Sequence, residues 1–154
     1  MIHSYIVALG SNMRVPGIGG PVRVIDAAMD ALGEGLVARS RCIASRPLGP
    51  SRRLYANAAA LVETPADPPA FLAQLHAIER AFGRRRRGAR WRARPLDLDI
   101  VLWSGGLWQS PDLVIPHRAF RERGFVLRPA AEVASGWRDP VTGLTLRQLS
   151  SRVA

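Results

Sequence analysis

Residues 96–103 have the sequence LDLDIVLW, in which apolar side chains alternate with two aspartates. Side chains i and i+2 of a strand lie on the same face, with their Cα atoms about 7 Å apart. The alternation predicts a strand that buries Leu96, Leu98 and Ile100 and leaves Asp97 and Asp99 together on the opposite face. Two neighbouring carboxylates repel each other, so this face needs a compensating cation, for which Mg²⁺ is well suited. The alternative is a pair of surface aspartates bonded to neighbouring arginines.

The segments around this strand show the periodicity of further strands and helices. Strands are expected over 4–9, 36–45 and 56–63, and helices over 21–33 and 67–82. Asp67 is expected to cap the second helix, with prolines in its first turn. After the LDLDIVLW strand, Gly105 and Gly106 are expected to turn the chain toward a short partner strand over 107–109. Short helical stretches over 117–123 and 125–134 and a small polar tail complete the expected elements.

The resulting order is strand, helix, strand, strand, helix, strand. This order is typical of the ferredoxin-like α+β sandwich, a mainly antiparallel sheet, and we expect its helices to pack on one sheet face. The chain of 154 residues is expected to form a single domain over 1–154.

The composition limits the classes of function. Hydrophobic residues make up 47% and charged residues 22%, as in ordinary globular proteins, and the single cysteine, Cys42, excludes an internal disulfide. The N-terminus lacks a signal peptide and no stretch approaches the ~20 apolar residues of a membrane span, so we expect a cytoplasmic monomer without a membrane partner. Lysine is absent, which excludes a Walker A loop in the glycine-rich segment after Gly10.

The basic charge is concentrated just before the aspartate pair. The formal net charge is +10, and eight of the fifteen residues 80–94 are arginine. Such a segment needs an anionic partner, such as nucleic acid, an anionic membrane surface or a polyphosphate; the alternative is a solvated basic loop. Guanidinium groups beside a carboxylate pair that holds a metal are the arrangement that phosphoryl transfer requires.

Four segments in order resemble the 6-hydroxymethyl-7,8-dihydropterin pyrophosphokinase family. They are IVALGSN, RPLGP with YANAAALVET, IERAFGRRRRGARWRARPLDLDIVLW, and VIPHRAFRERGFVLRPAAEVA. The resemblance extends from about Tyr5 to Ala134. It implies a ferredoxin-like fold and transfer of pyrophosphate from ATP to the hydroxymethyl group of the dihydropterin, giving AMP and the pterin diphosphate in folate biosynthesis.

The resemblance also implies a role for each matching residue. Asp97 and Asp99 would hold two Mg²⁺ ions, and Arg84 and Arg94 would contact the transferring phosphates. The positions that match the nucleotide site are Glu79, Arg86, Arg90, Trp91, Ile100, His117 and Arg123. The positions that match the pterin site are Pro47, Leu48, Tyr55, Asn57 and Phe125. In this assignment Tyr55 and Phe125 stack on the pterin, and Asn57 binds its polar edge.

Without the resemblance, three of these residues have simpler interpretations. Asn57 would be an ordinary turn residue, Phe125 a core residue, and His117 the cap of a helix. Several positions depart from the family pattern; among them, Arg92 stands where a small residue is usual, and Arg118 where an aromatic residue often follows the histidine.

Two rival functions remain to be weighed. A nucleic-acid-binding module would carry aromatic residues on its central strands, whereas these strands are aliphatic or acidic, so no nucleic-acid partner is expected. A non-catalytic relative would lack Asp97, Asp99 or Arg94, and all three are present. The length also led us to expect no fusion to another folate enzyme.

Overall fold

The computed structural model describes residues 1–45, 55–83 and 95–153. Its main sheet has the strand order β2-β4-β1-β5, with β3 also pairing with β4, and every one of these pairs is antiparallel. The strands are β1 (His3–Ser11), β2 (Leu36–Arg39), β3 (Ile43–Ser45), β4 (Tyr55–Thr64) and β5 (Asp97–Trp103). The expected α+β fold, with its mainly antiparallel sheet, is confirmed.

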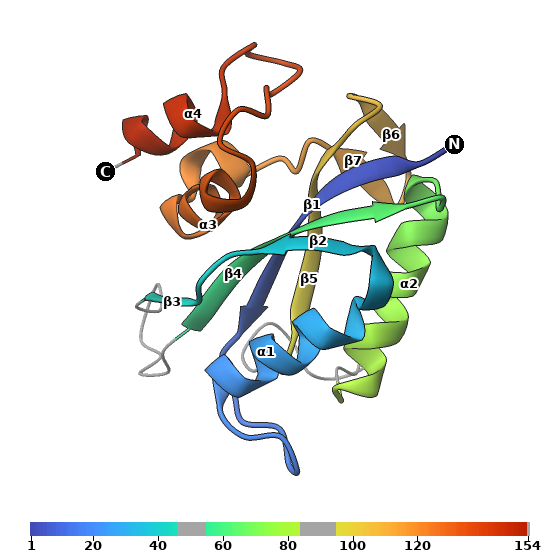
Figure 1. The fold of residues 1–154 in the computed structure, drawn as a ribbon, viewed down its shortest axis with the longest axis vertical. Coiled ribbons are helices and arrows are strands. Elements are labelled where there is room, and N and C mark those ends of the chain that lie inside the picture. The colour runs from blue at the N-terminus through green and yellow to red at the C-terminus, as the bar shows by residue number, and fades with distance from the viewer. Residues whose placement is uncertain (46–54, 84–94, 154) are drawn as a thin grey trace.

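Helices α1 (Pro21–Ala31) and α2 (Pro68–Ala81) cover one face of the sheet (Figure 1). The predicted cap of α2 is confirmed, because Asp67 Oδ1 accepts a hydrogen bond from Ala70 N at 3.1 Å. On this face Tyr5 stacks on Phe71 of α2 with ring centroids 4.3 Å apart, and its hydroxyl donates to Ala66 O at 2.7 Å. Apolar side chains from both helices and the sheet form the larger of two cores here.

The expectation that the helices cover only one face was wrong. Helices α3 (Gly124–Ala134) and α4 (Leu146–Arg152) belong to a second core on the opposite face, together with the buried Ile6 and Phe120 (Figure 1). The physical reason is that β1 is apolar at consecutive positions. Ile6 and Val7 are both fully buried although they point to opposite faces, so each face needs a cover.

The C-terminal segment is also more ordered than the expected polar tail. Thr145 Oγ1 accepts from Gln148 N at 3.1 Å, and Gln148 Oε1 accepts from Thr145 N at 2.9 Å, forming a capping box that begins α4. Leu146 and Leu149 of this helix are buried against the second core.

Three further local expectations need correction. The segment after β5 forms β6 (Trp108–Ser110), which pairs with β7 (Leu113–Ile115) rather than with β5. The expected strand over 36–45 is divided into β2 and β3, because the Ser40 side chain accepts the hydrogen bond of Ala59 N at 2.8 Å. Helical structure over 117–123 is limited to the short 3₁₀ turn η2 (Phe120–Glu122); a similar turn, η1 (Gly33–Gly35), follows α1.

Strand β5 contains a β-bulge. Val7 is opposite Ile100, but Ile6 is opposite Leu102, so Val101 is an extra residue in β5. As a result Val101 and Leu102 both contribute to the α3 side, whereas Leu98 and Ile100 belong to the core under α1 and α2. None of the helices in the described parts of the chain combines the length and apolar composition that crossing a membrane requires.

Candidate active site

Strand register brings the two aspartates and Asn57 onto one face of the sheet. Gly10 of β1 is opposite Asp97 of β5 on one side and opposite Asn57 of β4 on the other. Directly opposite residues of antiparallel strands share a face, so Asp97 and Asn57 lie on the same side with Gly10 between them. A Cβ atom at Gly10 would lie 3.5 Å from Asn57 Oδ1, so the amide side chain lies directly beside the Gly10 backbone.

The centre of this face carries only small side chains. One row along, Ala8 is opposite both Asp99 and Ala59, so glycine and alanine separate the two carboxylates from the polar residues of β4. Two strand spacings give a width of about 10 Å between β5 and β4. A small ligand could therefore contact the carboxylates at one end and Asn57 at the other without meeting a bulky side chain on β1.

The residues predicted to bind the pterin come from β4 and the start of α3. Tyr55 lies two residues before Asn57 and hence on the same face, and it is half-buried. Phe125 lies in the first turn of α3, a helix that packs against β4. The guanidinium carbon of Arg123 is 5.8 Å from the centre of the Phe125 ring, within the range of a cation–π contact. The structure thus places Tyr55, Asn57 and Phe125 on the same side of the sheet as the aspartates.

His117 is attached to the strand that carries the aspartates. Its backbone N donates to Val101 O at 3.0 Å, and its ring Nδ1 accepts from Ala119 N at 3.2 Å. Because Nδ1 acts as an acceptor, a neutral ring carries its proton on Nε2, which is then a donor. The interpretation of His117 as a helix cap is only partly right, since the ring binds the chain just before η2.

Glu79 of α2 and Ile100 of β5 both lie on the side of the sheet that α1 and α2 cover. Glu79 is 4% exposed, and its Oε2 accepts a hydrogen bond from Leu98 N at 2.8 Å, at the backbone between the two aspartates. The Ile100 side chain is 3% exposed and belongs to the core under these helices. Glu79 therefore binds the backbone of β5 from the side opposite the carboxylates. Any contact of Ile100 with a nucleotide would have to use its backbone.

The remaining predicted site residues lie outside the described residues. They are Pro47, Leu48, Arg84, Arg86, Arg90, Trp91 and Arg94.

The donor set at Asp97 and Asp99 fits Mg²⁺ better than a fully protein-bound metal. In the described ranges, no group of three or more histidine, cysteine, aspartate or glutamate residues could hold a metal ion. A structural zinc site needs about four such ligands, whereas Mg²⁺ commonly takes one or two carboxylates and completes its shell with water and phosphate oxygens. Two half-buried carboxylates on one sheet face match the second case.

Ala8, Gly10 and Ala59 were not predicted to belong to the site. The available signal was their small size at alternate positions of neighbouring strands, which is visible only once the register is known.

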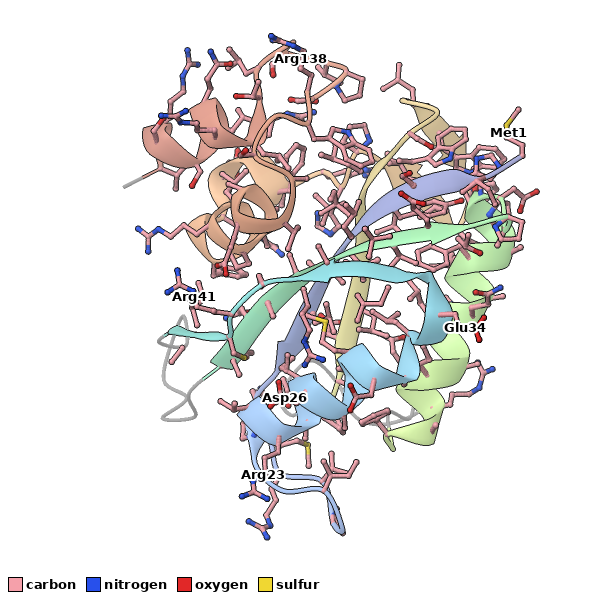
Figure 2. The ribbon with its side chains drawn as sticks, in the orientation of Figure 1. Met1, Arg23, Asp26, Glu34, Arg41 and Arg138 are labelled. Atoms are coloured by element: carbon pink, nitrogen blue, oxygen red, sulfur yellow. The ribbon has the colours of Figure 1, made fainter. Side chains whose placement is uncertain are left out.

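A groove of about 550 Å³ lies elsewhere, between the end of α1 and α2, with Glu34 (labelled in Figure 2) and Glu63 among its lining residues. It opens on the opposite face and at the opposite end of the sheet from the aspartates, so it is separate from this site.

Comparisons with known proteins show which family and fold this chain resembles. A protein-family model described as "7,8-dihydro-6-hydroxymethylpterin-pyrophosphokinase (HPPK)" matches residues 6–135. The chain is 37% identical to the 2-amino-4-hydroxy-6-hydroxymethyldihydropteridine pyrophosphokinase of Synechocystis sp., over 98% of this chain and 76% of that protein. It is 41% identical to the enzyme of the same name from Haemophilus influenzae, over 88% of this chain and 83% of that protein. The Plasmodium falciparum HPPK-DHPS crystal structure, 12% identical, superposes with a TM-score of 0.76 over 99% of this chain and 43% of that one and so shows the same fold.

Proposed function

Because the chain belongs to the 7,8-dihydro-6-hydroxymethylpterin-pyrophosphokinase family, we propose that its reaction takes place on the sheet face that carries Asp97, Asp99 and Asn57. The protein transfers pyrophosphate from ATP to the hydroxymethyl group of 6-hydroxymethyl-7,8-dihydropterin in folate biosynthesis. The observation that supports this location is the register, which aligns Asn57, Gly10 and Asp97 in one row across the sheet.

The two ends of this row suit the two parts of the reaction. A pterin is a flat bicycle with donors and acceptors along its edge, so it needs aromatic faces and an amide partner. Tyr55 and Phe125 provide the aromatic faces in this proposal, and Asn57 binds the polar edge. The hydroxymethyl group then points along the row toward Asp97 and Asp99, where the phosphates of ATP meet it.

Asp97 and Asp99 would hold two Mg²⁺ ions together with the phosphate oxygens of ATP. Mg²⁺ held there would supply positive charge to the phosphate oxygens and would favour loss of the proton from the attacking hydroxyl. In this proposal the two carboxylates position the phosphates, and Glu79 fixes their strand by accepting the hydrogen bond of Leu98 N. His117 Nε2 is available to donate to a phosphate oxygen, since Nδ1 is occupied by Ala119 N.

The arginines that precede β5 complete the proposed site. Arg84 and Arg94 contact the transferring phosphates, and Arg86, Arg90 and Trp91 with Arg123 contribute to ATP binding. Their support is the match to the family pattern and the dense positive charge of 80–94 immediately before the aspartates. A triphosphate with several charged oxygens is a suitable partner for this many guanidinium groups.

A product assay tests the reaction and the location together. Purified protein with Mg²⁺, ATP and the dihydropterin is expected to form AMP and the pterin diphosphate in equal amounts, as followed by ³¹P NMR. Formation of ADP, or no product from the folded protein, would contradict the proposal. Asn57→Ala is expected to raise the KM for the pterin with little change in the KM for ATP.

The number of metal ions can be counted separately. Mn²⁺ titration in the presence of a non-hydrolysable ATP analogue, followed by electron paramagnetic resonance, is expected to give two bound ions per chain. One bound ion would contradict the two-ion assignment without affecting the reaction.

We also propose that the chain forms a single domain over 1–154 and acts as a monomer in the cytoplasm. These proposals are consistent with a reaction between two small molecules.

A further inference from the structure

A buried carboxylate lies in the loop that joins α3 to α4. Asp139 is 0% exposed, and each of its two carboxylate oxygens accepts two hydrogen bonds. Oδ2 accepts from Arg121 Nε at 2.6 Å and from Thr142 Oγ1 at 2.8 Å. Oδ1 accepts from Arg121 Nη2 at 2.8 Å and from Val141 N at 3.0 Å. All four lone-pair positions of the carboxylate are thus used, two of them by one arginine in a bidentate contact.

This set of donors makes the buried charge favourable. Burial alone raises the pKa of Asp139, but the hydrogen bonds from Arg121, Val141 and Thr142 outweigh it and lower the pKa to about 2. The Arg121 side chain is 27% exposed, and removing it would leave the buried Asp139 carboxylate without its two charge-assisted hydrogen bonds. The bidentate contact thus ties Arg121 to a loop eighteen residues further along the chain.

Arg121 belongs to the segment that carries three predicted site residues. It lies in η2, between His117 and the pair formed by Arg123 and Phe125. The segment is attached to β5 at His117 N and to the second core through Phe120, which is 0% exposed. After Phe120, the Arg121 pair with Asp139 is a further side-chain contact of this segment with the rest of the fold, just before Arg123 and the start of α3.

We propose that Arg121 and Asp139 are positioning residues for substrate binding: their ion pair fixes η2 and the start of α3, and so places Phe125 and Arg123 over the sheet face that carries Asp97 and Asn57. This inference rests on the proposed function of that face. The pair touches no reacting group itself. It acts by keeping the pterin-stacking ring in its binding position before the substrate arrives, which lowers the cost of binding.

A purely structural role for the pair is the alternative, and the loop offers a matched control. Arg138 also binds this loop, since its Nη1 donates to Gly143 O at 2.7 Å. Arg138 is exposed and lies at the outer edge of the loop (Figure 2). Removing Arg138 takes away one hydrogen bond of the same loop but keeps the contact of η2 with Asp139. This variant therefore distinguishes an effect of loop stability from an effect of positioning Phe125.

The test compares Arg121→Met, Arg121→Lys and Arg138→Met at a temperature at which all three are folded. Arg121→Met is expected to raise the KM for the dihydropterin about tenfold and to change kcat less than threefold. Arg121→Lys keeps the charge but not the bidentate contact, and is expected to give an intermediate KM. Arg138→Met is expected to leave the KM unchanged. Direct binding of the pterin, followed by its own fluorescence, should show the same order.

Phe125→Ala distinguishes the failure of this inference from the failure of the proposed site. If Phe125→Ala raises the pterin KM and Arg121→Met does not, the positioning role is overturned and the site stands. If Phe125→Ala also has no effect, Phe125 is not a pterin contact and both statements fall.

Should Arg121→Met not fold, Thr142→Val removes one of the four donors without changing η2. A twofold to threefold rise in the pterin KM then supports positioning, and an unchanged KM overturns it.

Discussion

The two faces of the sheet are built from the same strands but are used differently. The face under α1 and α2 is apolar along the length of the sheet, from Tyr5 at one end to Leu98 at the other. The face under α3 is apolar only as far as Ala8 and Ala59; Asp99 lies in that row, and Asp97 and Asn57 lie in the next. The first face provides the larger core, and the second combines the smaller core with the residues of the proposed site.

This difference shows how a chain of modest size combines stability with a site on its sheet. Polar side chains are costly to bury unless they are hydrogen-bonded; Asp97 and Asp99 are half-buried, and Asn57 is only 7% exposed. Because strand side chains alternate, β5 can carry Leu98 in the core and Asp97 in the site at adjacent positions. The two faces should therefore respond to mutation in different observables, activity on one side and stability on the other.

The largest expected effect is on the site face. Asp97→Asn removes one metal ligand and relieves the repulsion with Asp99, so turnover should fall by about 10³-fold while the free energy of unfolding changes by less than about 0.5 kcal/mol. Product formation and urea unfolding measure the two quantities. Asp26→Asn is the matched control, because it removes an exposed carboxylate of α1 and should leave turnover unchanged. Near-normal turnover of a folded Asp97→Asn protein would contradict the metal assignment.

The opposite response is expected on the other face. Leu75 of α2 is 0% exposed in the larger core, and Leu75→Ala should lower the free energy of unfolding by about 3 kcal/mol. The kcat measured well below the melting temperature should stay within about twofold. A large fall in kcat in a folded protein would mean that the two faces are coupled, and the comparison would fail.

Acid should weaken the α3 side specifically. The pKa of Asp139 is about 2 in the folded protein and near 3.8 when it is unfolded, so its ionised form stabilises the fold above about pH 4. This stabilisation, on the order of 2 kcal/mol, is lost as the pH falls from the unfolded pKa through the folded one. Asp139→Asn removes it, so the stability difference between wild type and variant should shrink steadily between pH 5 and pH 2. A constant difference over that range would show that Asp139 does not carry the acid dependence.

The smallest expected effect concerns Tyr5, on the side of α1 and α2, where high pH should lower the free energy of unfolding. Burial, with the nearby Asp67 carboxylate, raises the pKa of Tyr5 from 10.0 to about 12. The neutral hydroxyl therefore stabilises the fold below pH 10, and this contribution disappears as the pH rises toward 12. Tyr5→Phe loses the hydrogen bond to Ala66 O and should cost about 1 kcal/mol at pH 7. Its stability should then fall less than that of the wild type between pH 10 and pH 12, as followed by urea unfolding.

Local sequence patterns predicted the parts of the fold that depend on near neighbours. The alternation around Asp97 and Asp99 and the cap at Asp67 both follow from a few adjacent residues, and both are confirmed. The capping box of Thr145 and Gln148 was an equally local signal that the analysis overlooked. The assignment of the site residues depended on the family resemblance, because Asn57 or Phe125 alone has several interpretations.

Features that depend on distant partners were not predictable from one sequence. The position of Asn57 beside Gly10 requires the register of β1 with β4, and a shift of one residue would move it to the other face. The pair of Arg121 with Asp139 joins residues eighteen positions apart across two elements, with no periodic pattern to indicate it. The second helical layer was missed because the apolar stretch of β1, with Ile6 and Val7 on opposite faces, was assigned only one covered face.

The bulge at Val101 has a consequence for insertions and deletions in this strand. Because Val101 is the extra residue, the rows on either side of it, Val7 with Ile100 and Ile6 with Leu102, are set independently of one another. A change of one residue in length at Val101 can be absorbed there, with both rows kept. The same change at Leu98 would reverse the alternation and turn Asp97 into the apolar core. The bulge thus gives β5 a position at which its length can vary, between the carboxylates and Leu102 of the second core.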